Sequence, residues 1–146
     1  MKIILLSLSL FFVTLSSFSQ KTHLPKGIIP DGVGIRKYHS KSELDRMQKG
    51  ELLVLYSERI KSLIKLLPYL AFTTRPGITM TSLGIPNDGN NKKVLNKQFD
   101  ATDSFLESND EFLKKILPYS DTRNLISAIL FYEETMKTLH EFGEYD

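Results

Sequence analysis

The sequence of 146 residues contains no cysteine and no tryptophan, and it has only three histidines. Without cysteine, the chain has no disulfide framework, no lipid anchor on an N-terminal cysteine and no thiolate chemistry. The histidines at positions 23, 39 and 140 have no partners at the spacing of metal ligands, and Lys137 stands where a Glu-x-x-His motif would need glutamate. We therefore predict no metal site and no cofactor.

An excess of charge of one sign is also missing. Without residues 1–19, the chain carries 18 basic and 17 acidic side chains, which gives no field to attract nucleic acid. The two halves differ, because residues 21–75 hold 11 basic and 5 acidic side chains whereas residues 76–146 hold 7 and 12. We interpret this as oppositely charged helices that pack within one domain. A head-to-tail contact between copies, or with a polar partner, is the alternative.

Motifs for nucleophilic catalysis are absent as well. The chain has no G-x-S-x-G sequence and no glycine-rich phosphate loop. Asp100, Asp103 and Glu107 share one helix face, where close carboxylates can serve as acid and base. A solvated acidic face opposite the lysines of the first helix is the favoured interpretation. We predict no catalytic residue, and an enzyme that uses this face or the threonine-rich connection stays open as an alternative.

The N-terminus has the pattern of a secretory signal peptide. Lys2 precedes an apolar run over residues 3–15, and Ser17 and Ser19 place small residues before a cut at Gln20. The run of 13 residues is shorter than the roughly 20 that a membrane-spanning helix needs. We expect residues 1–19 to be removed and the protein to be exported, to the periplasm or beyond, with no stable membrane span after cleavage.

Residues 20–40 are rich in glycine and proline and cannot form a continuous helix. The turn residues Pro30, Asp31 and Gly32 allow either a small hairpin or an extended arm. Packing of this arm on its own domain is the favoured interpretation. An apolar arm can also add to the sheet edge of a partner, so Ile28 and Ile29 are candidate interaction residues.

Three amphipathic helices are predicted in the bundle domain, residues 41–146. The first begins near Ser40, where Ser40-x-x-Glu43 has the form of a capping box, and Gly50 is a weak point inside it. The second begins between residues 88 and 92, and the third runs from about 121 to 142. The triplet Leu-Pro-Tyr recurs at 67–69 and 117–119, where each proline should stop a helix. The fold class is therefore all-α, an antiparallel bundle of three to four helices with a Gly/Pro-rich N-terminal arm.

The connection over residues 73–91 is long for a compact domain, which is typical of functional or mobile segments. It contains hydroxyl side chains around one arginine, a combination that can hold an anion or a peptide. The candidate ligand-binding residues are Thr74, Arg75, Thr79, Thr81 and Ser82. Ordinary turn chemistry is the favoured alternative, and a short extra helix near residues 81–85 would complete a bundle of four elements.

Several aromatic side chains flank the predicted core stripes. Phe105 and Phe112 lie beside the main stripe of the second helix, and Phe131 flanks that of the third. The pattern favours a widened core, and an exposed seam for a partner is the alternative that makes Phe105 and Phe112 candidate interaction residues. On the third helix, the row formed by Glu133, Lys137 and Glu141 favours surface pairing.

These observations favour an exported, non-catalytic interaction or accessory protein of the cell envelope. Its expected partner is another envelope protein or a second copy of itself. A carrier of small molecules or lipids, with a cavity between the helices, is the main alternative. The sequence does not indicate which partner is bound or in which oligomeric state the protein works.

Overall fold

The computed structural model describes residues 26–30 and 32–143. Within them, a short helix α2 (Lys41–Leu44) is followed by three long ones, α3 (Lys49–Leu66), α4 (Gly89–Ile116) and α5 (Thr122–Gly143). Single 3₁₀ turns occupy Leu67–Tyr69, Thr81–Leu83 and Leu117–Tyr119. The predicted all-α bundle is confirmed, and the predicted signal peptide and its cleavage site lie outside the described residues.

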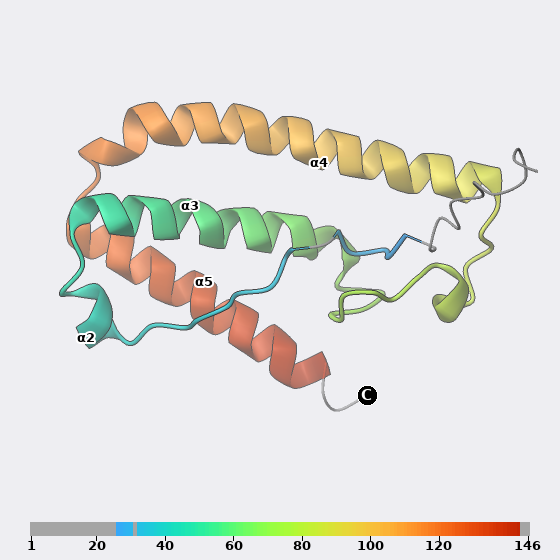
Figure 1. The fold of residues 1–146 in the computed structure, drawn as a ribbon, viewed down its shortest axis with the longest axis horizontal. Helices are drawn as coiled ribbons and strands as arrows, with labels where there is room; N and C mark the ends of the chain where they lie inside the picture. The colour runs from blue at the N-terminus through green and yellow to red at the C-terminus, as the bar shows by residue number, and fades with distance from the viewer. Residues whose placement is uncertain (1–25, 31, 144–146) are drawn as a thin grey trace, which may run out of the picture.

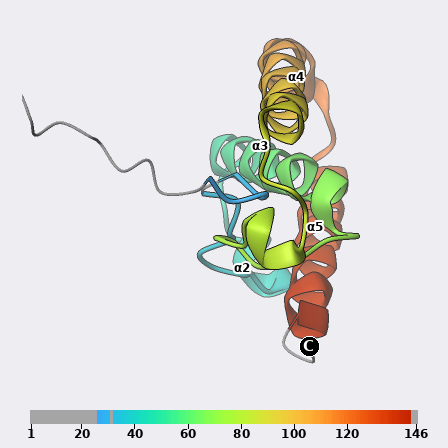
Figure 2. The same cartoon turned by 90° about the vertical axis from the view of Figure 1, so that its right-hand side faces the viewer.

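The long helices form an open bundle in which α3 is central. α4 packs along one side of α3 and α5 along another, so that α4 is an outlying helix with much of its surface uncovered (Figure 1, Figure 2). Consecutive long helices run antiparallel, which leaves α3 and α5 running in the same direction (Figure 1). In the part of the chain that the structure describes, no helix is long and apolar enough to cross a membrane.

The predicted first helix is in fact two helices. Ser40 and Glu43 form the expected capping box, but α2 ends after one turn, and α3 begins with a second capping box between Gln48 and Glu51. Each box satisfies backbone N–H groups that a helix start leaves unpaired, so the second box competes with continuation of the first helix. The poor helix propensity of Gly50 further favours a new start over a continuous helix.

The other two helices follow the sequence prediction. Asp88 is the N-cap of α4, because its Oδ1 accepts a hydrogen bond from Asn91 N at 2.8 Å, and the helix runs unbroken to Ile116. Both Leu-Pro-Tyr triplets form the 3₁₀ turns that close α3 and α4. Of the extra helix predicted near residues 81–85, only the turn Thr81–Leu83 forms.

The core has two parts. The first joins the arm to α3, α4 and α5, and the second joins α2 and α3 to the beginning of α5. The first consists of Ile28, Ile29, Val33, Leu63, Leu66, Tyr69, Phe99 and Met136. The second consists of Leu44, Leu52, Leu125, Ile126 and Ile129. Because α4 contributes little to the second cluster, its C-terminal half depends on fewer buried contacts than α3 or α5 does.

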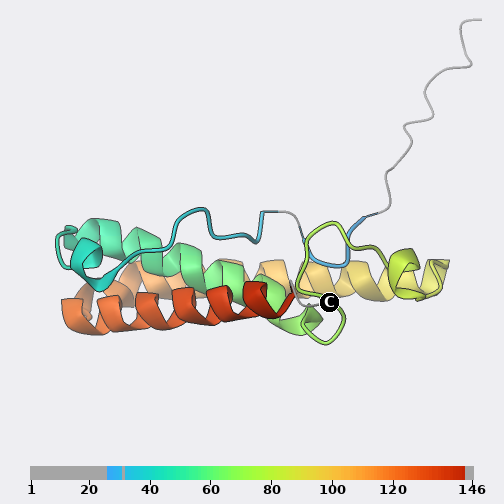
Figure 3. The same ribbon diagram turned by 90° about the horizontal axis from the view of Figure 1, so that it is seen from below.

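The N-terminal arm packs against its own domain. It runs along α3, as the view from below makes clear (Figure 3). Gly27 forms an isolated antiparallel bridge with Thr79, and Ile28 N donates to Ile78 O at 2.7 Å. The arm is therefore tied to the 73–91 connection, and in the described residues it does not form the hairpin that the turn residues allowed.

Oppositely charged side chains join α3 to α4. Lys61 Nζ lies 3.1 Å from Asp110 Oδ1, and Lys65 Nζ lies 3.5 Å from Asp103 Oδ1. Hydrogen bonds from Lys114 and Lys61 hold the pKa of Asp110 below its usual value. The interpretation that the positive and negative halves meet inside one domain is thus confirmed.

Candidate functional site

The most unusual surface of the molecule is an apolar stripe along α4. Val94, Phe105 and Phe112 are 62%, 54% and 58% exposed, and Ala101 between them is also exposed. At 100° per residue these side chains fall within a sector of about 40°, and the buried stripe of α4 is centred about 100° away. We call Val94, Ala101, Phe105 and Phe112 the aromatic stripe.

The aromatic stripe corrects the favoured interpretation from the sequence. Phe105, Phe112 and also Phe131, which is 64% exposed, were expected to widen the core, and none of them is buried. The reason lies in the open arrangement of the bundle. α3 covers only one side of α4, so apolar residues beside the buried stripe have no helix above them (Figure 2).

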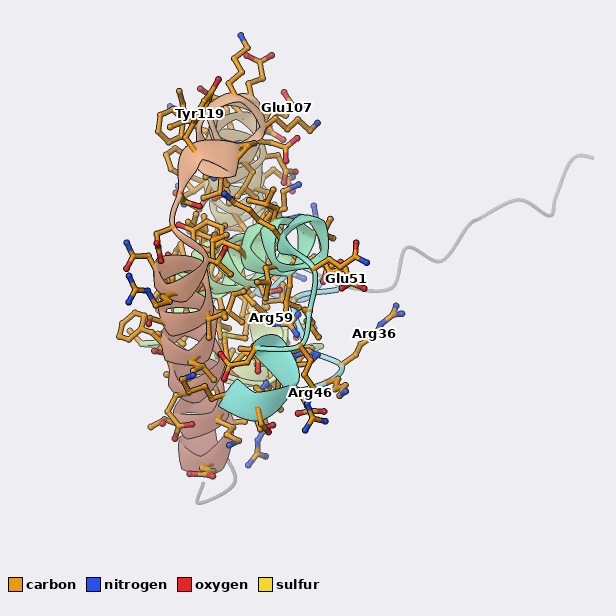
Figure 4. The ribbon with its side chains drawn as sticks, turned by 90° about the vertical axis from the view of Figure 1, so that its left-hand side faces the viewer. Arg36, Arg46, Glu51, Arg59, Glu107 and Tyr119 are labelled. Atoms are coloured by element: carbon orange, nitrogen blue, oxygen red, sulfur yellow. The ribbon has the colours of Figure 1, made fainter. Side chains whose placement is uncertain are left out.

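The two Leu-Pro-Tyr triplets differ at their tyrosines. Tyr69 is 4% exposed and its ring packs edge-on against Phe99 at a centroid distance of 5.9 Å. Tyr119 is 87% exposed, and Figure 4 shows it on one flank of α4 while Glu107 lies on the other. Since Phe105, Phe112 and Tyr119 are seven residues apart, the exposed tyrosine extends the aromatic surface past the end of the helix.

The two flanks of α4 differ in their charges. The acidic residues that face α3, Asp103 and Asp110, are in ion pairs. On the flank that is turned away from α3, Lys97 and Glu111 are exposed, and no ion pair within 4 Å is described for either. Ser104 lies between them on the same flank. The flank of the aromatic stripe therefore carries charges of both signs, with Lys97 and Glu111 nearer its middle and the exposed Lys93 and Lys115 nearer the helix ends.

The predicted ligand-binding residues separate into two groups. Thr79 and Ser82 cap the 3₁₀ turn reciprocally, since Thr79 N donates to Ser82 Oγ at 2.9 Å and Ser82 N donates to Thr79 Oγ1 at 3.2 Å. Thr81 is the first residue of that turn and is exposed. For Thr79 and Ser82 these are the hydrogen bonds of ordinary turn chemistry, the alternative that the sequence favoured.

Thr74 and Arg75 lie elsewhere, at a cavity of about 430 Å³. Tyr38 from the arm and Lys137 and His140 from α5 also line it. The Tyr38 hydroxyl is buried without a hydrogen-bond partner, and burial, with the nearby Glu133 carboxylate, raises the pKa of Tyr38. The cavity is thus lined by basic and aromatic side chains from the arm, the connection and α5. Of these residues, only Thr74 and Arg75 were grouped from the sequence.

Ile28 and Ile29 are core residues, 5% and 1% exposed. The structure packs both against α3, α4 and α5, so they are not available to a partner in this conformation. Their candidacy as interaction residues is corrected accordingly. In the part of the arm that the structure describes, the strand-like contact is with the protein's own connection.

A buried charge cluster holds the arm, α3 and α5 together. Arg59 Nε donates to Glu133 Oε1 at 2.8 Å, and an Arg59 terminal nitrogen donates to Lys37 O at 2.8 Å. His39 contacts the same carboxylate through its backbone N–H and through Nδ1, the latter at 2.9 Å. Arg59 appears at the centre of the molecule in Figure 4. Because every member is hydrogen-bonded, the cluster avoids the cost of an unpaired buried charge.

Glu133 corrects another expectation from the sequence. The row formed by Glu133, Lys137 and Glu141 favoured surface pairing, but Glu133 is 3% exposed and Lys137 pairs with Glu134 at 3.6 Å. Glu133 lies four residues after the fully buried Ile129, which places it on the core stripe of α5. This spacing was the feature of the sequence from which its burial could have been predicted. Its partner Arg59 lies seven residues after the buried Leu52, on the core side of α3.

The described residues contain no group of three or more histidine, aspartate or glutamate side chains that could hold a metal ion. Asp103 and Glu107 are exposed on α4, and neither lines the cavity at Thr74 and Arg75. Of the acidic face, Asp103 lies in a contact between α3 and α4, where its Oδ1 is 3.5 Å from Lys65 Nζ.

Comparison with known proteins adds no relationship: no family model, no curated protein and no solved structure matches this chain.

Proposed function

We propose that the protein is an exported, non-catalytic interaction protein of the cell envelope, and that the aromatic stripe of α4 is its docking surface. The observation that carries the proposal is the exposure of Phe105 and Phe112 on a long, well-formed helix. On a helix that already has a separate buried stripe, these two phenylalanines leave more than half of their surface in water, and the monomer gains nothing from that exposed part. Contiguous exposed apolar surface on a soluble domain is typical of protein interaction sites.

The composition of the stripe supports the same proposal. Aromatic side chains are enriched at the centres of protein interfaces, where they supply most of the binding energy. They stand here on a helix, and an apolar helix face is a common recognition surface. Export is a separate part of the proposal and depends on the signal-peptide pattern of residues 1–19.

The test is a comparison of variants in the protein's own cells. Tagged protein, tagged Phe105→Ser/Phe112→Ser and tagged Phe131→Ser are each purified gently from the envelope. Phe131 is the matched control because it is 64% exposed and lies on α5. We expect any protein that copurifies in stoichiometric amount with the wild type and the control to be lost from the double variant. Equal recovery with all three proteins would contradict the proposal.

One observation favours a second candidate, a carrier of a small apolar molecule. A cavity of about 320 Å³, lined mainly by apolar side chains, lies where the first Leu-Pro-Tyr turn meets the connection and the start of α4. Its volume is near the lower limit for ligand sites, about 300 Å³. The Tyr69 hydroxyl, from a residue that lines this cavity, is buried without a partner, and burial raises its pKa. Mass spectrometry of small molecules extracted from the purified protein, with Tyr69→Phe as the control, tests this candidate.

A further inference from the structure

We infer that the occupant of the aromatic stripe is a second copy of this chain, whose α4 lies antiparallel to the first across a two-fold axis. This inference rests on the proposed docking role of the stripe and names its partner. Most natural oligomers are symmetric, and a two-fold contact requires a surface that is complementary to itself. The aromatic stripe and its charged flank meet that requirement in one particular register.

The register follows from the positions of large and small residues. Exposed residues at 98, 101, 105, 108 and 112 recur at alternating spacings of three and four, as along the seam of a two-helix coiled coil. The phenylalanines at 105 and 112 alternate with the small residues Ala101 and Ser108. In an antiparallel pair, a large side chain from one helix can therefore pack over a small one from the other.

A two-fold axis near residue 103 places these residues opposite one another. Phe105 then faces Ala101 of the second copy, Phe112 faces Val94 of the second copy, and Gln98 faces Ser108 of the second copy. The midpoint of Gly89–Ile116 falls between residues 102 and 103, so the same axis aligns the two helices over nearly their entire length. The register that matches large residues to small ones is thus also close to the register of greatest overlap.

The charged flank agrees with this register. The axis brings Lys97 opposite Glu111 of the second copy, and symmetry repeats the pair, while Ser104 meets its own counterpart at the axis. Neither Lys97 nor Glu111 has an ion pair described in the single chain. A parallel arrangement would instead gather the lysines at 92, 93 and 97 of both copies at one end and align the two helix dipoles unfavourably.

The size of the contact indicates a weak dimer. A helix of 28 residues is about 42 Å long, and a contact strip about 10 Å wide on each copy gives about 800 Å² in total. Stable protein interfaces bury about 1,200–2,000 Å². We therefore expect a dimer that dissociates on dilution through the micromolar range, rather than a permanent assembly.

The experiment measures sedimentation velocity of the purified protein from about 1 μM to about 1 mM, the range in which a weak dimer dissociates. We expect Lys97→Glu and Glu111→Lys each to raise the dimer dissociation constant about tenfold, because each puts like charges opposite one another twice. The double variant Lys97→Glu/Glu111→Lys restores the pairs and should return the constant to within about twofold of the wild type. Glu141→Lys makes the same charge change on the exposed surface of α5, outside α4, and should leave the constant unchanged.

A crosslinking experiment checks the axis itself. The chain has no cysteine, so a single introduced thiol is unique. We expect Ser104→Cys to form a covalent dimer with a short bismaleimide, and the exposed Ser127→Cys on α5 not to do so. Circular dichroism verifies that each variant keeps its helical content.

The outcomes separate this inference from the proposed function. Loss of the dimer in both single charge variants and its recovery in the double variant support the antiparallel register. A dimer that neither charge variant weakens uses another surface and overturns the inference. A protein that stays monomeric at every concentration also overturns it, but the docking role of Phe105 and Phe112 then survives if another envelope protein is lost from the double phenylalanine variant.

Discussion

Replacement of Glu133 by alanine should destabilise the fold far more than replacement of any exposed carboxylate. Arg59 and Glu133 are 6% and 3% exposed, so the substitution leaves a guanidinium in the interior with only the exposed Glu58 carboxylate, 3.6 Å away, as a counter-charge. Removal of one partner from a buried ion pair costs about 3–5 kcal/mol. Because folded domains are stable by only about 5–15 kcal/mol, Glu133→Ala should lose a large share of the free energy of unfolding.

The assay is urea-induced unfolding followed by circular dichroism. Glu134→Ala is the matched control, since Glu134 is the next residue and its side chain is 74% exposed, in a surface pair with Lys137. An exposed pair of this kind contributes at most about 1 kcal/mol, so the control should unfold close to the wild type. Arg59→Leu/Glu133→Leu, which removes both charges, should be more stable than Glu133→Ala. If Glu133→Ala lowered the free energy of unfolding by less than about 1 kcal/mol, that would refute the claim that the buried charges of this cluster depend on one another.

Three further predictions concern a cap and two titrating groups. Asp88→Ala removes the N-cap of α4 and should lower the free energy of unfolding by about 1 kcal/mol, whereas Asp88→Ser, measured by the same urea titration, should retain most of it. The pKa of Glu43 is lowered to about 2 from 4.5, chiefly by the backbone hydrogen bond from Ser40, so its stabilising effect is complete above pH 4.5 and is lost as the pH falls toward 2. The stability difference between wild type and Glu43→Gln should therefore shrink across that window, and a constant difference would contradict the assignment. Burial and the hydrogen bond with Tyr56 raise the pKa of Tyr132 to about 12, so an alkaline absorbance titration should lose its last tyrosine step in Tyr132→Phe.

Local signals in the sequence were sufficient for the long helices. The apolar spacing from Leu95 to Ile116 allowed either one long helix or a break at residues 108–110, and the helix is continuous. Each proline of the Leu-Pro-Tyr triplets marked a helix end. The break before α3 was not predicted, because two capping boxes eight residues apart are both compatible with the apolar pattern. Both boxes form, and the two short-range starts are reconciled by the packing of Leu44 from α2 and Leu52 from α3, which are both fully buried in one cluster.

The candidate site was harder to predict because burial depends on which helices meet. The spacing of Phe105 and Phe112 places them beside the buried stripe, but their exposure follows from the absence of a helix over that side of α4. Likewise, Glu133 and Arg59 are 74 residues apart, and only the packing of α3 against α5 reveals them as partners. Sequence periodicity indicates the face of a helix on which a residue lies, but not whether another element covers that face.

The most direct test of the docking surface is site-specific photocrosslinking in the protein's own cells. A photoreactive phenylalanine analogue replaces Phe105 or Phe112 in turn, and Phe131 on α5 as the exposed control outside α4. We predict adducts at positions 105 and 112 whose mass is that of two copies of the chain, and none at position 131. Positions 105 and 112 that give no adduct of any kind, or no more than position 131 does, would contradict the claim that the aromatic stripe is where this protein meets its partner.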